Sequence, residues 1–386
     1  MGMNVSLVEA ATSLRRAISD AARGLVEREP LVELIALAAV AQEHVLVIGP
    51  PGTAKSEAVR RVARATGGVY FEYLLGRFTE PSEIFGPVDL RRLKEGVVET
   101  ETFGMLPEAE VAFLDEIFQG STAILNTLLG LLNERVFRRG HTRVNCPLRV
   151  CVGASNALPE DDALAAFADR FLIRAFVEPI PDPMLERLLE GGWSLGQEPA
   201  RHWASMSDID ALAEAARAAD MSGVRAQLGK AVRILRGAGI TLTDRRSVKA
   251  QRLIAAAAVM AGRERPTEAD LWPVVFAVPT HEQQALARDC LRELLSATEN
   301  GSLPSAAEEA SRGPLARAAR IAQAARQILD ERPATEDPSA ARDWRLRLEG
   351  AAREIDACFA PEQMPQELVE VRVRIIEELG QAGGPQ

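Results

Sequence analysis

A phosphate-binding loop lies between a short apolar run and an amphipathic segment, and it restricts the chain to few folds. Residues 44–49 read as a β-strand, residues 49–56 read GPPGTAKS, and a helical pattern begins at Lys55. A strand, a glycine-containing loop and a helix in this order can surround a phosphate with backbone N–H groups and the positive helix end. The sequence therefore predicts an α/β nucleotide-binding domain.

The loop supplies the expected nucleotide contacts. We expect Lys55 to reach the β- and γ-phosphates and the Ser56 hydroxyl to bind Mg²⁺. Ala54 stands where the usual pattern has glycine, and we expect it to be tolerated because its backbone takes a negative φ as the helix begins. The predicted nucleotide-binding residues are Gly49, Pro50, Pro51, Gly52, Thr53, Ala54, Lys55, Ser56 and Glu57.

A second motif delivers two adjacent carboxylates at the end of a strand. The apolar run 111–114 predicts a buried strand, and Asp115 and Glu116 follow it directly. Ligands of open α/β sheets bind at the carboxyl ends of the strands. We expect Asp115 to hold Mg²⁺ together with Ser56, and Glu116 to orient or deprotonate the attacking water. A solvated strand end is the ordinary alternative, but the preceding phosphate-binding loop favours hydrolysis of a nucleoside triphosphate.

Further polar residues follow these motifs. Asn156 ends an apolar β run and can position water or the γ-phosphate, although asparagine is also a common turn former. Arg170 and Arg174 follow a helix, where a guanidinium can reach a neighbouring subunit's phosphate or form a surface salt bridge. Arg245 and Arg246 open a later helix and can contact phosphates from a lid or remain solvated.

The chain changes character after a proline-rich break at residues 177–183. Before the break, strands and helices alternate, which predicts a parallel sheet covered by helices. After it the β runs stop and helical patterns continue to the end. We expect an αβα nucleotide-binding core over 1–180, an all-α lid domain over 181–295 and a helical C-terminal extension over 296–386.

Charge and cysteine usage restrict the class of protein. Of 386 residues, 55 are acidic and 45 are Lys or Arg, and the net charge of -10 disfavours a general nucleic-acid-coating protein. The four cysteines are scattered without a C-x-x-C pair, so we expect neither a zinc site nor a disulfide framework. No apolar run reaches a membrane-spanning length. We expect a cytoplasmic protein without membrane insertion.

With these motifs in this order, the chain resembles AAA+ ATPases of the MoxR group, most closely the RavA-like branch. The resemblance covers about residues 20–285, and alanine before the loop lysine is a normal variant in this group. After residue 295 the chain departs from RavA, because it shows helical patterning where RavA carries a β-rich module. The segments that carry the resemblance are GPPGTAKS, FEYLLGRFTEPSEIFGPVDL, LPEAEVAFLDEIFQGSTAILNTLLGLLNERVFR, ASNALPE, DRFLIR and TDRRSVKA.

The resemblance assigns roles to the motifs. It implies Walker A at 49–56, Walker B at Asp115 and Glu116, sensor 1 at Asn156, an arginine finger at Arg170 and a sensor 2 arginine, for which we favour Arg245 over Arg246. It also implies a helix-2 insert at about 86–105 and a pre-sensor-1 hairpin at about 137–150. The segment 24–35 is similar to the family segment that lies near the adenine.

The resemblance also implies partners. Family members form hexameric rings that use ATP and Mg²⁺ to remodel or activate a protein client or to insert a metal or cofactor, commonly with a von Willebrand factor A (vWA) domain protein. Two other functions remain open. A nucleic-acid-linked motor would use the basic residues of the hairpin, and a nucleotide-gated scaffold would use the helical tail as its docking platform. The basic hairpin residues are Arg138, Arg139, His141 and Arg143.

Overall fold

The computed structural model describes residues 2–194, 202–333, 338–359 and 364–381, and the chain divides into two compact units. The first unit comprises Met1–Arg23, Arg28–Glu178 and Pro199–Ser311. The second unit comprises Gly24–Glu27, Pro179–Glu198 and Arg312–Gln386. None of the helices in the described residues is long and apolar enough to cross a bilayer.

A five-stranded parallel sheet forms the centre of the first unit, in the order β2-β3-β6-β1-β7. The inner strands are continuous apolar runs because a parallel sheet is covered on both faces. This arrangement confirms the predicted α/β P-loop core. The strands are β1 (Val45–Ile48), β2 (Tyr70–Leu74), β3 (Val111–Asp115), β6 (Val150–Ser155) and β7 (Ile173–Phe176).

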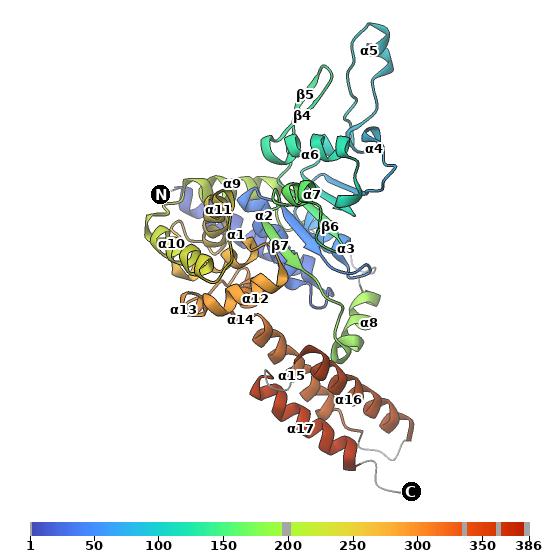
Figure 1. Ribbon diagram of the computed structural model, residues 1–386, viewed down its shortest axis with the longest axis vertical. Coiled ribbons are helices and arrows are strands. Elements are labelled where there is room, and N and C mark those ends of the chain that lie inside the picture. Colours follow the sequence, from blue (N-terminus) through green and yellow to red (C-terminus); the bar gives the residue numbers. More distant parts are fainter. Residues whose placement is uncertain (1, 195–201, 334–337, 360–363, 382–386) are drawn as a thin grey trace. The chain divides into compact units, whose positions relative to one another are not determined.

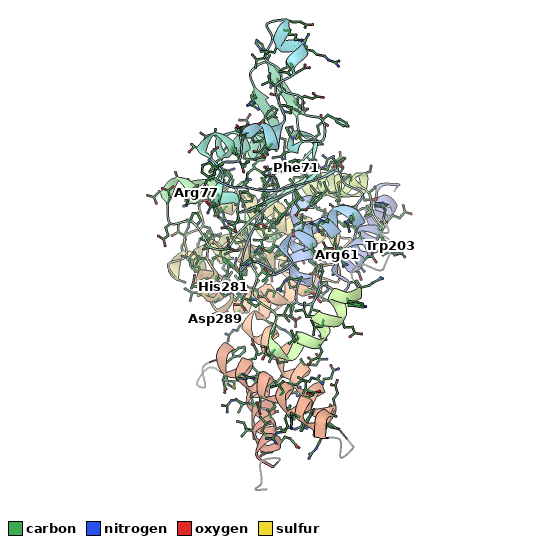
Figure 2. The ribbon with its side chains drawn as sticks, turned by 90° about the vertical axis from the view of Figure 1, so that its right-hand side faces the viewer. Arg61, Phe71, Arg77, Trp203, His281 and Asp289 are labelled. Atoms are coloured by element: carbon green, nitrogen blue, oxygen red, sulfur yellow. The ribbon has the colours of Figure 1, made fainter. Side chains whose placement is uncertain are left out.

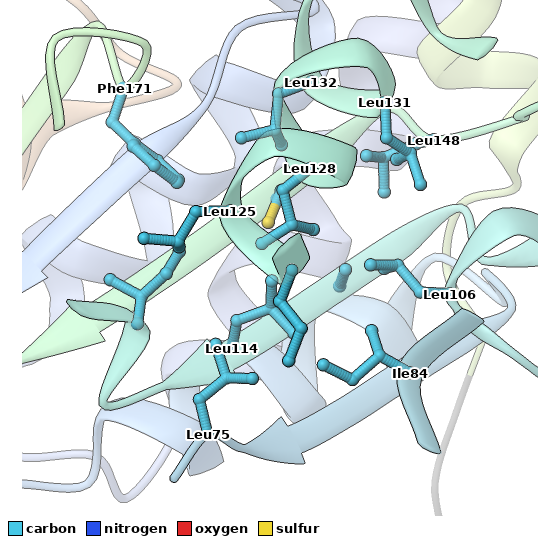
Figure 3. Close-up of a cluster of buried hydrophobic side chains, with 14 of the residues drawn as sticks. Leu75, Ile84, Leu106, Leu114, Leu125, Leu128, Leu131, Leu132, Leu148 and Phe171 are labelled. Atoms are coloured by element: carbon cyan, nitrogen blue, oxygen red, sulfur yellow. The ribbon is translucent and has the colours of Figure 1, made fainter. Parts of the chain in front are cut away.

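Helix α6 (Thr122–Glu134) covers one face of this sheet. Ser121 caps the helix, since its hydroxyl accepts a hydrogen bond from the Ile124 N–H. The leucines of α6 recur every three or four residues, so they form one stripe that packs against Leu114 of β3 and its neighbours (Figure 3). The stripe includes Leu125, Leu128, Leu131 and Leu132.

Three helices lie on the other side of the sheet: α1 (Gly2–Ala22), α2 (Glu29–Ala41) and α3 (Lys55–Ala65). Helix α2 contacts β1, β6 and β7, and its residues from Leu31 to Ala41 are all buried. They are apolar apart from Glu33, whose carboxylate accepts from the Ser305 and Ala306 N–H groups. Arg61 of α3 donates to the carbonyl oxygens of Ala21 and Arg23, where α1 ends. The Trp203 N–H donates to Ala65 O at the end of α3, and Figure 2 shows Trp203 close to Arg61.

The predicted insert and hairpin lie side by side (Figure 1). The His141 N–H donates to Val98 O (3.0 Å), and the Thr100 N–H donates to the Thr142 hydroxyl (2.7 Å). The two segments are therefore joined to each other as well as to the core. The insert contains α5 (Leu90–Lys94), and the hairpin is formed by β4 (Val136–Arg139) and β5 (Thr142–Asn145). Helix α4 (Pro81–Phe85) precedes the insert.

Helices complete the first unit after the sheet ends. The segment 267–276, within the part of the chain that we expected to be helical, forms the 3-10 helices η4 and η5, because Pro273 lacks the N–H that a continuous α-helix would require there. The elements are α9 (Met206–Ala218), α10 (Ser222–Gly237), α11 (Asp244–Met260), η4 (Glu268–Asp270), η5 (Trp272–Ala277), α12 (His281–Cys290), α13 (Arg292–Leu295) and α14 (Pro304–Arg312).

The second unit has its own apolar core and confirms the helical character of the tail. Three helices pack around buried residues such as Leu348 and Ile375. The Trp344 indole N–H donates to Ile328 O (2.7 Å) and ties two of the helices together. The elements of this unit are η3 (Asp182–Met184), α8 (Leu185–Ser194), α15 (Pro314–Asp330), α16 (Pro338–Cys358) and α17 (Gln366–Gln381).

Candidate nucleotide-binding site

The phosphate-binding loop connects β1 to α3 at the carboxyl end of β1, which lies between β6 and β7 in the sheet. The Gly49 N–H donates to Ser155 O (3.1 Å), which continues the pairing of β1 with β6. A Cβ atom on Gly49 would lie 2.2 Å from Val177 O, so no larger residue fits at this position. The sheet therefore fixes the start of the loop, and α3 fixes its end.

The loop leaves its backbone donors available to an anion. Among the described residues, no backbone acceptor binds the N–H groups of residues 54–56. These donors lie at the N-terminus of α3, where the helix dipole adds positive potential. The loop therefore has the donors that a phosphate site requires, and the phosphate site itself stays a prediction.

Lys55 points back into the loop. Its ammonium group donates to Gly49 O (2.8 Å) and Pro50 O (2.9 Å), and the residue is 7% exposed. Burial lowers the pKa of Lys55, and the nearby Arg28 cation lowers it further, against the opposing effect of the carboxylates of Asp115 and Glu116. The four charged groups therefore share one environment at the mouth of the loop.

Ala54 adopts a backbone conformation that we did not expect. Its φ is +59° and its ψ is 27°, in the left-handed region, so the expectation of a negative φ is wrong. This conformation suits glycine and costs an L-residue roughly 1–2 kcal/mol. The path of the loop requires a left-handed backbone conformation at position 54, and in this chain an alanine adopts it with strain.

Asp115, Glu116 and Asn156 come together at the same edge of the sheet. Asp115 ends β3, and its carboxylate accepts from the Glu116 N–H (3.0 Å). The Asn156 side-chain N–H donates to Glu116 Oε1 (2.9 Å), just beyond the end of β6. Glu116 has a φ of +48°, a left-handed conformation that is strained for this residue. The strained turn and the amide together set the direction of the Glu116 carboxylate.

The loop and β3 offer the groups that Mg²⁺ prefers. The half-buried Ser56 supplies a hydroxyl and the half-buried Asp115 supplies a carboxylate. Among the described residues, no cluster of three or more His, Cys, Asp or Glu side chains forms a self-sufficient metal site. Mg²⁺ binds readily through one or two protein oxygens plus phosphates and water, so these residues fit it as the partner of a bound nucleotide.

Sequence reasoning missed Arg28, which lies against the loop. Its Nε donates to Thr53 O (2.8 Å) and its NH2 donates to Glu178 O (2.7 Å), and the residue is 5% exposed. The resemblance placed the segment 24–35 near the nucleotide but gave Arg28 no role. These two carbonyl groups are distant from Arg28 in sequence, so no local pattern reveals the bonds.

The structure separates Arg170 and Arg174 from this site. Both lie near the amino end of β7, whereas the loop follows the carboxyl end of β1. Arg174 is 3% exposed, and burial lowers its pKa to about 9. Arg170 is more accessible and donates to Ala166 O (3.0 Å). Of the two, Arg170 is the side chain that is able to reach outside the first unit.

Arg245 and Arg246 also lie away from the loop. The Arg245 guanidinium contacts the Asn133 side chain in the last turn of α6. His44, which precedes β1, binds Leu132 O in the same turn (2.9 Å), so this turn lies at the amino edge of the sheet. The 1%-exposed Arg246 donates to four backbone oxygens of its own chain, and these belong to Asp169, Phe171, Leu172 and Ala277.

Comparisons with known proteins agree with the geometry. A sequence model described as the MoxR domain of MoxR–vWA–beta-propeller ternary systems matches residues 12–214. An uncharacterized protein of Methanocaldococcus jannaschii is 36% identical over 249 residues, which are 64% of this chain and 66% of that protein. Chaperone MoxR1 of Mycobacterium tuberculosis is 28% identical over 208 residues, which are 53% of this chain and 54% of the chaperone. The chain thus matches less than two thirds of the length of either relative.

A solved structure shares the fold. The crystal structure of a protein from Cytophaga hutchinsonii, provisionally described as an ATPase, superposes with a TM-score of 0.61 and 15% sequence identity. The superposition covers 76% of this chain and 97% of the other.

Proposed function

The chain belongs to the MoxR family of AAA+ ATPases, and on this basis we propose that it binds ATP with Mg²⁺ and hydrolyses the ATP to ADP and phosphate. The observation that carries the proposal is the convergence of Lys55, Asp115, Glu116 and Asn156 beside a loop with available N–H donors. We further propose that the protein works in the cytoplasm, where its thiols stay reduced.

In this mechanism each residue has a separate task. The loop N–H groups and Lys55 bind the β- and γ-phosphates, and Lys55 leaves its two carbonyl partners to do so. Ser56 and Asp115 hold Mg²⁺, which supplies positive charge that offsets the charge on the phosphates. Asn156 holds the Glu116 carboxylate, which orients the attacking water and accepts its proton.

The decisive test replaces Glu116 with glutamine. The variant keeps the shape of the side chain but loses the base, so we expect ATP binding to persist while phosphate release falls by at least a hundredfold. Glu108→Gln is a matched control, because Glu108 lies in η1 outside the site. Normal turnover by the Glu116→Gln variant would remove Glu116 from the mechanism.

We propose that the protein acts as a ring, with a hexamer as in related AAA+ proteins. Arg170 and Arg245 lie at the sheet edge opposite their own loop, so in a ring they would serve the nucleotide of a neighbouring copy. Arg170→Ala and Lys55→Ala variants should each be inactive, and mixed rings of the two should regain part of the activity. Mixed rings without any recovered activity would argue against a trans-acting Arg170.

We propose that the ATPase cycle remodels or activates a protein client together with a vWA-domain protein. The support is the matched family description, which names a vWA component. The finer placement in the RavA-like branch stays a prediction from the sequence motifs. Affinity capture with the Glu116→Gln variant, followed by mass spectrometry, should recover a vWA protein in the presence of ATP. If no vWA protein is recovered either with ATP or without it, this role is contradicted.

A nucleic-acid-linked motor receives less support. Arg138 of the hairpin pairs with Glu134 (2.6 Å), and Arg139 donates to Gly86 O (3.2 Å). These bonds occupy side chains that a phosphate backbone would otherwise use. Salt-dependent DNA binding that is lost on replacing Arg138 and Arg139 would favour this alternative.

A further inference from the structure

Arg28 connects the phosphate-binding loop to the chain that follows β7. It precedes α2, it is almost fully buried, and its guanidinium group donates to Thr53 O and Glu178 O. A planar guanidinium holds two carbonyl groups in a fixed relation, which the flexible ammonium of lysine cannot do. The position of the Thr53 carbonyl is therefore set by the sheet through Glu178.

The bond to Thr53 fixes the orientation of a whole peptide group. The described chain has no cis peptide bonds, so the Thr53 C=O and the Ala54 N–H point in opposite directions. With its carbonyl turned toward Arg28, this peptide presents the Ala54 N–H on the other side. That N–H is one of the loop donors without an acceptor in the described part of the chain.

The same peptide adjoins the strained residue. Ala54 has a φ of +59°, which its methyl group disfavours, so the loop loses strain if the peptide rotates. The Ala58 N–H donates to Ala54 O, as in a regular α-helix. The Thr53 carbonyl accepts from Arg28 and not from the Glu57 N–H, which would be its partner if the helix continued backwards. Arg28 thus supplies the restraint on this carbonyl.

We propose that Arg28 is a positioning residue that holds the Thr53–Ala54 peptide in its strained orientation and so keeps the Ala54 N–H directed at a nucleotide phosphate. This inference rests on the proposed ATP binding and extends it to a residue outside the loop. A glycine at position 54 adopts the left-handed conformation without strain, so the restraint matters most because the chain carries alanine there.

The test is a double-mutant cycle on the full chain with Arg28→Met and Ala54→Gly. Binding of a fluorescent ATP analogue with Mg²⁺ and steady-state phosphate release are measured for each variant. We expect Arg28→Met to weaken binding at least tenfold in the natural background and less than threefold in the Ala54→Gly background. The maximal turnover at saturating ATP should change less than twofold, because Arg28 acts through the loop that binds the phosphates, whereas the proposed role of Glu116 is to orient the attacking water.

Controls separate this role from a general loss of stability. Arg64→Met changes an exposed arginine at the end of α3 and should leave binding unchanged. Arg28→Lys keeps the positive charge but lacks the planar guanidinium group that donates to two carbonyl groups. We therefore expect it to restore less than half of the affinity for the ATP analogue that Arg28→Met loses. The melting temperature of each variant without nucleotide shows whether the folded population is intact.

The outcomes are distinct. Unchanged affinity in Arg28→Met, or an equal loss in both backgrounds, would overturn the positioning role while leaving the proposed ATP binding in place. If the natural protein itself fails to bind the nucleotide, the proposed function fails and takes this inference with it.

Discussion

Replacing Asn156 with alanine probes the geometry of the site most directly. In the natural protein the Asn156 amide donates to Glu116 Oε1 at 2.9 Å, and Glu116 sits in a strained left-handed turn. Without the amide the carboxylate is able to rotate away from the position in which it orients water. We expect the effect on turnover and not on nucleotide affinity, because Asn156 does not belong to the loop that holds the phosphates.

The magnitude follows from the strength of this bond. A hydrogen bond to a charged group contributes about 1.5–3 kcal/mol, and each 1.36 kcal/mol in a barrier changes the rate about tenfold. The Asn156→Ala variant should therefore lose about 10- to 150-fold in kcat. Asn156→Asp should lose more, because it replaces the donor with a second carboxylate that repels Glu116.

The assay is steady-state phosphate release across a range of ATP concentrations, with nucleotide affinity measured separately. Asn126→Ala is the matched control, since Asn126 is an exposed residue of α6 and should behave as the natural protein does. A kcat within twofold of the natural value in Asn156→Ala, or a loss confined to KM, would refute the reasoning.

Three further predictions concern stability and are measured by urea unfolding. Burial holds the pKa of His44 well below its usual 6.5, so as pH falls from 7.5 to 5.5 His44 takes up a proton in the unfolded chain but not in the folded chain. Over this pH range the free energy of unfolding of the natural protein should therefore fall by about 1.4 kcal/mol more than that of His44→Gln. Equal falls in the two proteins would contradict this. Gly86→Ala places a Cβ 1.8 Å from a backbone oxygen at a φ of +107° and should cost about 1–3 kcal/mol, more than Gly104→Ala, which has a positive φ but open space; equal costs would exclude the steric clash. Arg246→Met leaves four carbonyl groups and the Asp169 carboxylate without their donor and should cost about 3–5 kcal/mol, against less than 1 kcal/mol for Arg245→Met; similar losses would show that the buried bonds contribute little.

The sequence predicted what depends on local pattern. The loop, the carboxylates after β3 and the asparagine after β6 each follow an apolar run, and the parallel sheet brings the ends of such runs to one edge. Their spacing along the chain was therefore sufficient to place Lys55, Glu116 and Asn156 together. The helical tail was also predicted, because its apolar residues recur at helical spacing.

What the sequence left out depends on contacts between distant segments. Arg28 binds carbonyl groups 25 and 150 positions away, and any residue can supply a carbonyl group, so no residue type marks the partners. The left-handed conformation of Ala54 follows from the closure of the loop between β1 and α3, and alanine carries no sign of it. Likewise, TDRRS predicted a helix start, but only the packing of α11 distinguishes the buried Arg246 from the more accessible Arg245.

The bonds that join the insert to the hairpin have a consequence for protein engineering. Since His141 and Thr142 hold Val98 and Thr100, a chimaera that receives one of these segments from a relative would pair it with a foreign neighbour and leave backbone donors unmatched. A chimaera that receives both segments from the same relative keeps the hydrogen bonds between them. Exchanges of this region between homologues should therefore succeed as pairs and fail singly.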